Sequence, residues 1–368
     1  SGDAQDSRGQ RSAQPAGPPP EDLSYLNETF TWEVTCLDLE TGKELWKQVA
    51  FKGKPRTKKH PMNTYANETP VTDGKRLYAY FGNIGLFCYD LAGKLMWKKD
   101  LGAYETRNGW GTGASPVLFR NLVIVKMDND TTSFITALDA ANGNEVWKVT
   151  RDEKTTYSTP VIWKNNLRTE LVTTGKITRS YDPMTGKLLW QLQTGGEMSI
   201  PSPVYDDEHI YLGNAGGRDN PGFLYAVKAG AEGDISLKKG ATSGNGVVWS
   251  SGETGLANPS PLLYKGMIYV LASRGGELNV LDAATGKSLS KRKIEKVGAC
   301  WATPWIANEK LFFYDEKGIT HLINPGLLLE ELGQNRLDDK LWASPAITRK
   351  AYIFRGAKKI YCLKQIQK

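Results

Sequence analysis

A short motif repeats along this chain and constrains its fold more than any other sequence feature. The motif joins an aspartate, a glycine-containing turn and a tryptophan, as in LDLETGKELW at residues 37–46. Related copies start at residues 89, 138, 181 and 281. Tryptophans at positions 46, 97, 147, 190 and 249 mark successive units, which places them 51, 50, 43 and 59 residues apart. Similar units of this length are expected to form one structural module each and to stack side by side.

Each unit has the pattern of four short β-strands. A turn that contains Ser-Pro or Thr-Pro leads into an apolar run, and an alternating run such as LYAYFG (77–82) follows it. A third run ends in the aspartate of the motif, and a fourth ends in the tryptophan. Alternation with a period of two, interrupted by Gly, Asn and Asp, is typical of strands. The repeat therefore predicts an all-β fold, a β-propeller of four-stranded antiparallel blades.

The number of blades can be estimated from the Pro turns, of which there are seven. Residues 32–49 contain only a third and a fourth strand, and the last unit ends after its third strand, KIYCLK (359–364). We therefore favour eight blades, of which the first and the last are incomplete. The alternative is seven blades, with residues 43–49 as a closing strand on the C-terminal unit. Unpaired sheet edges promote association, so the missing strands should be replaced or cause oligomerisation.

The domain organisation is expected to be simple. Residues 32–368 are predicted to form a single propeller domain. Residues 1–31 are predicted to be a disordered or surface segment, because the chain opens with a stretch rich in Gly, Pro, Ser and Gln. This opening stretch lacks methionine and resembles the interior of a longer protein. No apolar run approaches the length of a membrane-spanning helix.

The repeated motif is predicted to fasten each blade to the next one. Glycine supplies the positive φ angle that a tight turn between the third and fourth strands needs. The aspartate can accept hydrogen bonds from the amides of this turn. The wide indole ring can pack between neighbouring blades, with its N–H bonded to a backbone carbonyl. The docking residues predicted in this way are Trp46, Trp97, Trp147, Trp190 and Trp249.

Charge and cysteine content limit the classes of function. The net charge is +7 and the isoelectric point about 9.0, but basic and acidic residues are interspersed and no nucleic-acid fold signature is present. We expect no nucleic-acid partner. Three of the four cysteines occupy equivalent repeat positions, too far apart for disulfides, and are expected to be free and buried. No C-x-x-C pair or paired histidines occur, so neither a metal site nor a catalytic residue is predicted.

The tryptophan motif resembles the docking motif of PQQ-like propeller repeats. Quinoprotein alcohol dehydrogenases share this pattern with the propeller lipoprotein of bacterial outer-membrane assembly. The resemblance covers residues 32–368. Stretches such as ETPVTDGKRLYAYFG and RNGWGTGASPV also resemble the PQQ-binding-like propeller proteins of planctomycete-type bacteria. The resemblance implies a bacterial protein in the periplasm or otherwise outside the cytoplasm.

The connections between consecutive blades are the candidate binding region. In a propeller these connections gather at one mouth of the central channel, where a concave site can form. Aromatic, polar and charged residues there would suit a peptide, a sugar or a planar molecule; alternatively, the aromatic side chains plug the channel. The candidate ligand-binding residues are His60, Asn63, Tyr65, Glu68, Arg107, Trp110, Lys154, Tyr157, Glu197, Trp301 and Trp342.

Two functions are compatible with this reading. The favoured one is a non-enzymatic scaffold that binds a protein, peptide or glycan through the funnel and its loops, including the basic connection 49–65, without a cofactor. The alternative, implied by the resemblance, is a PQQ- and calcium-dependent quinoprotein dehydrogenase. Its calcium ligands would come from Glu68, Glu197 and Asn258, with Trp301 as the floor under the cofactor. The adjacent cysteine pair of many such dehydrogenases is missing from the sequence.

Overall fold

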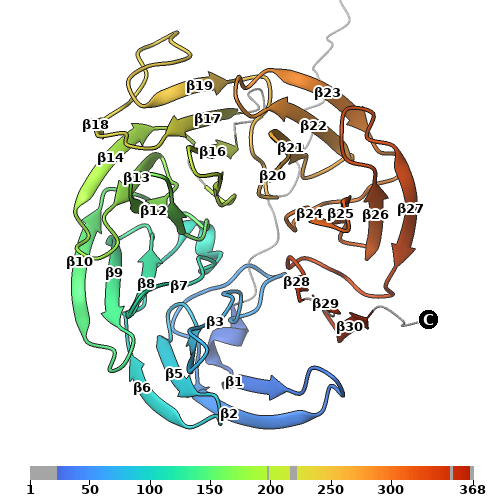
Figure 1. The fold of residues 1–368 in the computed structure, drawn as a ribbon. Helices are drawn as coiled ribbons and strands as arrows, with labels where there is room; N and C mark the ends of the chain where they lie inside the picture. The colour runs from blue at the N-terminus through green and yellow to red at the C-terminus, as the bar shows by residue number, and fades with distance from the viewer. Residues whose placement is uncertain (1–22, 197–198, 216–221, 349–350, 365–368) are drawn as a thin grey trace, which may run out of the picture.

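The chain folds into a ring of small antiparallel β-sheets around a central axis (Figure 1). The computed structural model describes residues 23–196, 199–215, 222–348 and 351–364. In each blade the strands follow one another in sequence order from the channel to the rim. This arrangement confirms the predicted all-β propeller. In the described ranges, no helix has the length and apolar character needed to span a membrane.

Six blades contain the four meandering strands that the repeat predicts. From the innermost strand outward, the first three are β3–β6 (Val71–Thr72, Arg76–Tyr80, Leu86–Asp90, Leu95–Lys99), β7–β10 (Val117–Phe119, Leu122–Met127, Ser133–Asp139, Glu145–Arg151) and β11–β14 (Val161–Lys164, Thr169–Thr173, Ile177–Tyr181, Leu188–Gln193). The next three are β15, β16, β17 and β19 (Val204–Tyr205, His209–Ala215, Gly222–Lys228, Val247–Ser251), β20–β23 (Leu262–Tyr264, Met267–Leu271, Glu277–Asp282, Ser288–Lys293) and β24–β27 (Trp305–Ala307, Lys310–Tyr314, Ile319–Ile323, Glu331–Arg336).

The two remaining sheets lie on either side of the point where the ring closes. β28–β30 (Ala346–Ile347, Ala351–Arg355, Ile360–Lys364) form a three-stranded blade, whereas β1 (Phe30–Leu37) and β2 (Glu44–Gly53) form only a hairpin. The described chain thus has seven blades of three or more strands, which matches the seven-blade alternative rather than the favoured eight. The favoured count was wrong because it included this hairpin as an incomplete first blade, whereas the hairpin has only two strands.

The ring does not close as the seven-blade alternative predicted, with residues 43–49 as a closing strand on the C-terminal blade. In the described residues β2 pairs with β1 alone and does not join the C-terminal blade. The first and last sheets meet through side chains instead. The Lys364 ammonium lies 2.8 Å from the Glu40 carboxylate, and Arg355 donates to the carbonyl of Ala66 at 3.1 Å. The seam is therefore held by polar contacts of exposed groups, which contribute little stability individually.

The N-terminal part of the chain begins on the surface. The 3₁₀ helix η1 (Ser24–Asn27) precedes β1, which starts at Phe30, two residues before the predicted domain start. The ammonium group of Lys59 lies 5.3 Å from the ring centre of Tyr25. Residues 23–29 thus contact the basic connection that leads toward the channel mouth. Of the segment 1–31 that was predicted to be disordered or on the surface, residues 1–22 lie outside the described residues.

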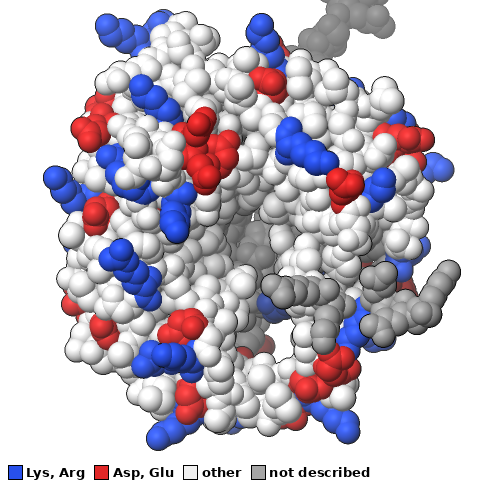
Figure 2. Space-filling model, viewed as in Figure 1, with Lys and Arg blue, Asp and Glu red and all other residues white. Residues whose placement is uncertain are grey.

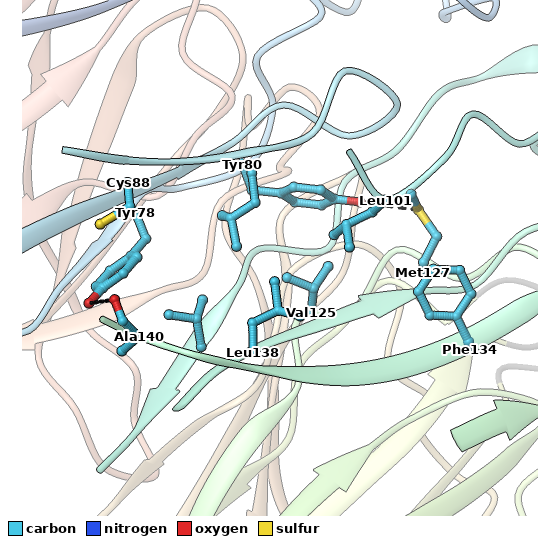
Figure 3. Packing of buried hydrophobic residues seen from close by; sticks show 11 residues of the cluster. Tyr78, Tyr80, Cys88, Leu101, Val125, Met127, Phe134, Leu138 and Ala140 are labelled. Carbon is cyan, nitrogen blue, oxygen red and sulfur yellow. Dashed lines mark hydrogen bonds between the residues drawn. The ribbon is translucent and has the colours of Figure 1, made fainter. Parts of the chain in front are cut away.

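The hydrophobic core lies between blades, because each blade is only one sheet thick and must bury both faces against its neighbours. Figure 3 shows one such interface, where Tyr78 and Cys88 of one blade pack with Val125 and Leu138 of the next. The Tyr78 hydroxyl donates to the carbonyl of Ala140 at 3.0 Å across this interface. Packing on both faces explains why second and third strands such as β8 and β9 are buried along almost their whole length.

The predicted tryptophan docking occurs at four interfaces. Each indole N–H donates, over 3.0–3.2 Å, to the carbonyl of the residue that follows the motif aspartate in the next blade. The donor–acceptor pairs are Trp46–Leu91, Trp97–Ala140, Trp147–Pro183 and Trp249–Ala283. Each ring also lies on the turn glycine of that blade, since a Cβ on Gly93, Gly143, Gly186 or Gly286 would come within 2.8 Å of it. The glycine is therefore required for space as well as for its positive φ angle.

A β-bulge aims these tryptophans at the next blade. In β6, Trp97 pairs with Cys88 and Leu95 pairs with Tyr89, so that Met96 is the extra residue. The same irregularity precedes Trp147 in β10. A bulge increases the local twist and redirects the side chain that follows it. The recurring extra residue thus turns the indole out of its own sheet.

Trp190 departs from the predicted docking. Its indole N–H donates at 2.7 Å to the carboxylate of Glu170 within its own blade. Trp163 makes the bond to the next blade instead, at 2.8 Å from the carbonyl of Asp206. The reason is an insertion that replaces the Thr-Gly-Lys turn of the next blade. Its strand β18 (Gly233–Asp234) pairs in parallel with β14 and leaves no turn glycine on which Trp190 could lie.

The cysteines are free in the described chain, as expected. Cys88 and Cys300 are buried, and Cys36 is half-buried. Cys362 is exposed, so the expectation that the three cysteines at equivalent repeat positions are buried was wrong for this one. Cys362 lies on β30, and no fourth strand covers it in the described residues.

Candidate functional site

A ring of hydroxyl groups holds the innermost strands at the channel. The Thr69 N–H donates to Ser115 Oγ of the next blade at 2.9 Å, and the Ser115 N–H donates to Thr159 Oγ1 at 3.0 Å. Equivalent bonds of 3.0 Å join Ser202 to Ser260 and Thr303 to Ser344. All seven residues precede the proline of a Pro turn. Sequence analysis missed this role, although the recurrence of Ser or Thr before proline was the signal for it.

Two mouth loops are joined around Trp110. The His60 N–H donates to the Trp110 carbonyl at 3.2 Å, and Asn63 Nδ2 donates to the same oxygen at 3.4 Å. The His60 ring meets the indole edge-on, with 5.6 Å between ring centres. Trp110 follows the 3₁₀ turn η2 (Arg107–Gly109). The structure therefore brings three predicted site residues together, with both rings half-buried.

Two further candidates border a small cavity behind this pair. Tyr65 and Glu68 line it together with Lys58 and Lys59, and its volume of about 20 Å³ suits a single water molecule. Thr112 Oγ1 donates to the Glu68 carboxylate at 2.5 Å. Burial raises the pKa of Glu68 to about 7, and the bond from Thr112 only partly offsets this effect. A carboxyl group with this pKa can gain or lose a proton near neutral pH.

The next two mouth loops are joined through Thr155. Its hydroxyl accepts the Arg107 N–H at 2.9 Å and donates to Asp130 at 2.7 Å. Lys154 Nζ donates to the carbonyl of Asp130 at 2.9 Å. The backbone of Arg107 and the side chain of Lys154 are therefore positioned by bonds to neighbouring loops.

Tyr157 extends this chain of loop contacts by one more blade. Its N–H donates to the carbonyl of Ser199 at 2.7 Å. Its hydroxyl is buried and has no hydrogen-bond partner in the described part of the chain. Burial raises the pKa of Tyr157 to about 12, so the hydroxyl keeps its proton at neutral pH. Tyr157 therefore retains an O–H group that can donate a hydrogen bond.

A buried ionic cluster supports the loop that carries Tyr157. Arg151 Nε donates to Asp128 at 2.7 Å, and Lys126 Nζ donates to Thr156 and Ser158 at 2.6 and 3.0 Å. Burial lowers the pKa of Lys126 to about 8, against the opposing charge of Asp128. Partnered buried charges of this kind fix local geometry. Sequence analysis missed the cluster, for which the lysine inside the apolar run LVIVKM was the signal.

The remaining candidates are not hydrogen-bonded to these joined mouth loops, which form an arc from His60 to Tyr157. Trp301 and Trp342 are half-buried on the connections before β24 and β28. The Trp301 indole N–H is buried and has no partner among the described residues. Glu197 lies outside the described residues. The structure therefore joins His60, Asn63 and Trp110 directly and places the other described candidates on the neighbouring connections or on those before β24 and β28.

The calcium site implied by the resemblance is described only in part, because Glu197 lies outside the described residues. Calcium prefers carboxylate and carbonyl oxygens. Of the other two predicted ligands, Glu68 is buried and Asn258 is half-buried on the connection before β20. Within the described ranges, no three His, Cys, Asp or Glu side chains lie close enough to hold a metal ion. The calcium ligand set therefore stays a prediction.

Basic and acidic side chains are interspersed on the face drawn in Figure 2, which is hollowed near the axis. The described part of this face shows no broad patch of a single sign.

The indole contacts between neighbouring blades, together with the loops at the channel mouth, define a β-propeller of the tryptophan-docking class. A family model described as "Outer membrane protein assembly factor BamB" matches residues 31–162 and 93–325. These matches cover most of the chain, so the protein belongs to this family. A search of curated protein sequences gave no match.

Solved structures share the fold at low sequence identity. BamB from Moraxella catarrhalis is 14% identical and has a TM-score of 0.60, over 87% of this chain and 88% of that one. Quinohemoprotein alcohol dehydrogenase from Comamonas testosteroni is 13% identical with a TM-score of 0.59, over 88% and 67% of the two chains. The computationally designed protein Ika8 is 12% identical with a TM-score of 0.51, over 82% and 98%. At these identities the likeness concerns the fold alone.

Proposed function

We propose that the protein is a non-enzymatic scaffold of the periplasm or another extracytoplasmic space, and that it binds a protein, peptide or glycan at the channel mouth. The observation that carries this proposal is the arc of mouth loops from His60 through Trp110 and Arg107 to Tyr157. Each loop is hydrogen-bonded to the next one. Loops ordered in advance reduce the entropy lost on binding, and aromatic rings with nearby donors suit such ligands.

The family supports a protein partner within this range. Its description names an outer-membrane assembly factor, and BamB from Moraxella catarrhalis shares the fold. An assembly factor needs a fixed surface rather than a reacting centre. We propose accordingly that binding requires neither PQQ nor calcium.

Site-specific photo-crosslinking tests this function. Benzoylphenylalanine is placed at Trp110 on the arc and, as the matched control, at Leu328, which is 82% exposed away from the mouth loops. Irradiation in envelope extract of the source organism should join one recurring macromolecule to position 110 and not to position 328. Equal crosslinking at both positions would contradict the proposal. A new visible absorption band with alcohol oxidation after addition of PQQ and calcium would favour the dehydrogenase instead.

A further inference from the structure

The interface between the blades β20–β23 and β24–β27 lacks a docked tryptophan. In the outer strand β23, Ser290 pairs with Val280 of β22. In the blade β3–β6, Trp97 pairs with the equivalent residue Cys88. Ser290 therefore occupies the position of a docking indole, and its hydroxyl donates to the carbonyl of Leu327 at 2.5 Å instead. These two blades, which lie side by side in Figure 1, are thus joined without an indole ring.

A cavity of about 230 Å³ lies at this interface. At docked interfaces the indole contacts a tyrosine of its own blade and a carbonyl of the next blade. Trp249, for example, lies 6.1 Å from the ring centre of Tyr211 and donates to the carbonyl of Ala283. Tyr269 of β21 and Pro325 after β26 occupy the equivalent positions, and both line the cavity. The missing indole is therefore a physical reason for the open space between these blades.

The cavity lies on the face of the ring opposite the mouth loops. Its walls include the turn 265–266 between β20 and β21, the turn 308–309 between β24 and β25, and residues 324–325 after β26. Successive turns of an antiparallel meander alternate between its two ends, so these turns lie opposite the connections between blades. An enclosed cavity of about 150 Å³ accepts benzene. The volume of this cavity therefore suits a single six-membered ring.

Charged and amide groups line the cavity. Lys265 Nζ lies 2.9 Å from the Glu309 carboxylate and 5.1 Å from the ring centre of Tyr264. Lys310 Nζ donates to Asn324 Oδ1 at 3.4 Å and makes no ion pair within the part of the chain that the structure describes. The lining therefore carries two ammonium groups against one carboxylate, which leaves an excess of positive charge.

These groups favour one chemical class of ligand. A carboxylate on the ligand would give the Lys310 ammonium the ionic partner that it lacks. Glu309 can accept hydrogen bonds from hydroxyl groups, and the Asn324 amide can both donate and accept them. The ring of Tyr264 supplies an apolar wall against which the C–H groups of a sugar can pack. A neutral sugar would leave the ammonium without a counter-charge, and an aromatic acid would offer no hydroxyl groups to the other two side chains.

We propose that this cavity binds a hexuronate, a six-membered sugar ring that carries one carboxylate. The carboxylate pairs with Lys310, and the hydroxyl groups bond to Asn324 and Glu309. A free sugar and the end residue of an acidic polysaccharide present the same ring and the same charge. The cavity is separate from the mouth loops, so its test does not depend on the proposed function of the mouth.

Three small ligands test this chemistry. Glucuronate, glucose and benzoate are each titrated with the protein, and binding is followed by saturation-transfer NMR. We expect glucuronate to bind with a millimolar or lower dissociation constant. Glucose, which lacks the charge, and benzoate, which lacks the hydroxyl groups, should each bind at least tenfold more weakly. An oligomer of four glucuronate residues distinguishes the sources, because equal or tighter binding than the monomer indicates a chain end and weaker binding indicates the free sugar.

Protein variants localise the binding. Lys310→Ala should weaken glucuronate at least tenfold, because it removes the partner of the carboxylate. Asn324→Asp should do the same, because it places a second carboxylate beside the ligand. Lys317→Ala is the matched control, since Lys317 is exposed in the turn between β25 and β26 on the other face of the same blade. It removes the same charge and should leave the affinity unchanged. Thermal unfolding verifies that all three variants are folded.

Three results would overturn the proposal. The first is no binding of glucuronate at millimolar concentration. The second is binding of glucose or benzoate as tight as that of glucuronate. The third is an equal affinity for glucuronate in folded Lys310→Ala and Lys317→Ala.

Discussion

Trp147 lies so close to Gly186 of the next blade that a Cβ on this glycine would be 2.8 Å from the indole ring. The same indole donates its N–H to the carbonyl of Pro183, in the turn that Gly186 closes. The tryptophan of one repeat and the glycine of the next are therefore two halves of one contact. This pairing explains why both residues recur together along the sequence.

Replacement of the turn glycine should be more destabilising where an indole covers it. Gly186→Ala combines the strain of a positive φ angle, about 1–2 kcal/mol, with overpacking against Trp147, about 1–3 kcal/mol. The matched variant Gly266→Ala has the φ strain alone. We expect urea unfolding to show a larger loss of unfolding free energy for Gly186→Ala. Equal losses would mean that the indole moves aside without cost.

Removal of a docked indole should loosen two blades at once. Trp147→Ala is expected to lower the free energy of unfolding by about 3–5 kcal/mol, as large-to-small core substitutions do. The control is Val146→Ala, because Val146 is the neighbouring bulge residue and is 50% exposed. Val146→Ala should lower the free energy of unfolding by less than about 1 kcal/mol. Thermal or urea unfolding of both variants measures the difference, and similar losses would contradict the docking role.

The ring of hydroxyl groups at the channel can be tested at Ser115. Its Oγ accepts the N–H of Thr69 at 2.9 Å. Ser115→Ala leaves this N–H without its acceptor and should lower the free energy of unfolding by about 1 kcal/mol. Ser115→Thr keeps the hydroxyl group and should remain close to the wild type. If both variants were equally stable, the hydroxyl would not be part of the fastening.

From the raised pKa of Glu68 we predict that the free energy of unfolding depends on pH. Burial raises its pKa in the folded protein to about 7, from 4.5. Between these values the unfolded chain loses the proton before the folded one does, so this group lowers stability as pH rises from about 4.5 to 7. Above pH 7 the penalty is on the order of 3 kcal/mol, from about 1.4 kcal/mol per pKa unit.

Glu68→Gln should remove this penalty, because glutamine cannot ionise and still accepts the bond from Thr112. In urea unfolding, the variant should match the wild type at pH 5 and exceed its stability at pH 8. The measured quantity is the difference between the two proteins at each pH, which cancels the other titrating groups. A difference that is the same at both pH values would show that Glu68 ionises freely in the folded state.

The repeat unit could be predicted because the aspartate, glycine and tryptophan of one hairpin are close in sequence. The tryptophan contacts could be predicted because the hairpin recurs, so that each tryptophan meets the turn of the next copy. The failure at Trp190 has a non-local cause, since the insertion of the following blade removes the turn that would receive its ring. The hydroxyl ring was missed for a similar reason, because Thr69 and Ser115 meet only when their blades stand side by side.

In the candidate site, too, some features could be predicted from the sequence and others depended on tertiary contacts. The connections that carry His60 and Trp110 could be assigned to the channel mouth from strand order alone. That their backbones bond to each other, while Trp301 and Trp342 remain separate from this arc, depends on the path of each loop. Loop conformation follows from many weak contacts with neighbouring blades, which periodicity does not encode.

The amino-acid sequence by itself determined the strand pattern, the motif turns and the class of fold, because alternation and positive-φ glycines act over a few residues. Tertiary structure alone decided the count of seven blades with three or more strands, the exposed edge of β30 and the meeting of the mouth loops. These features arise when the twist between blades accumulates around the ring and brings distant residues into contact.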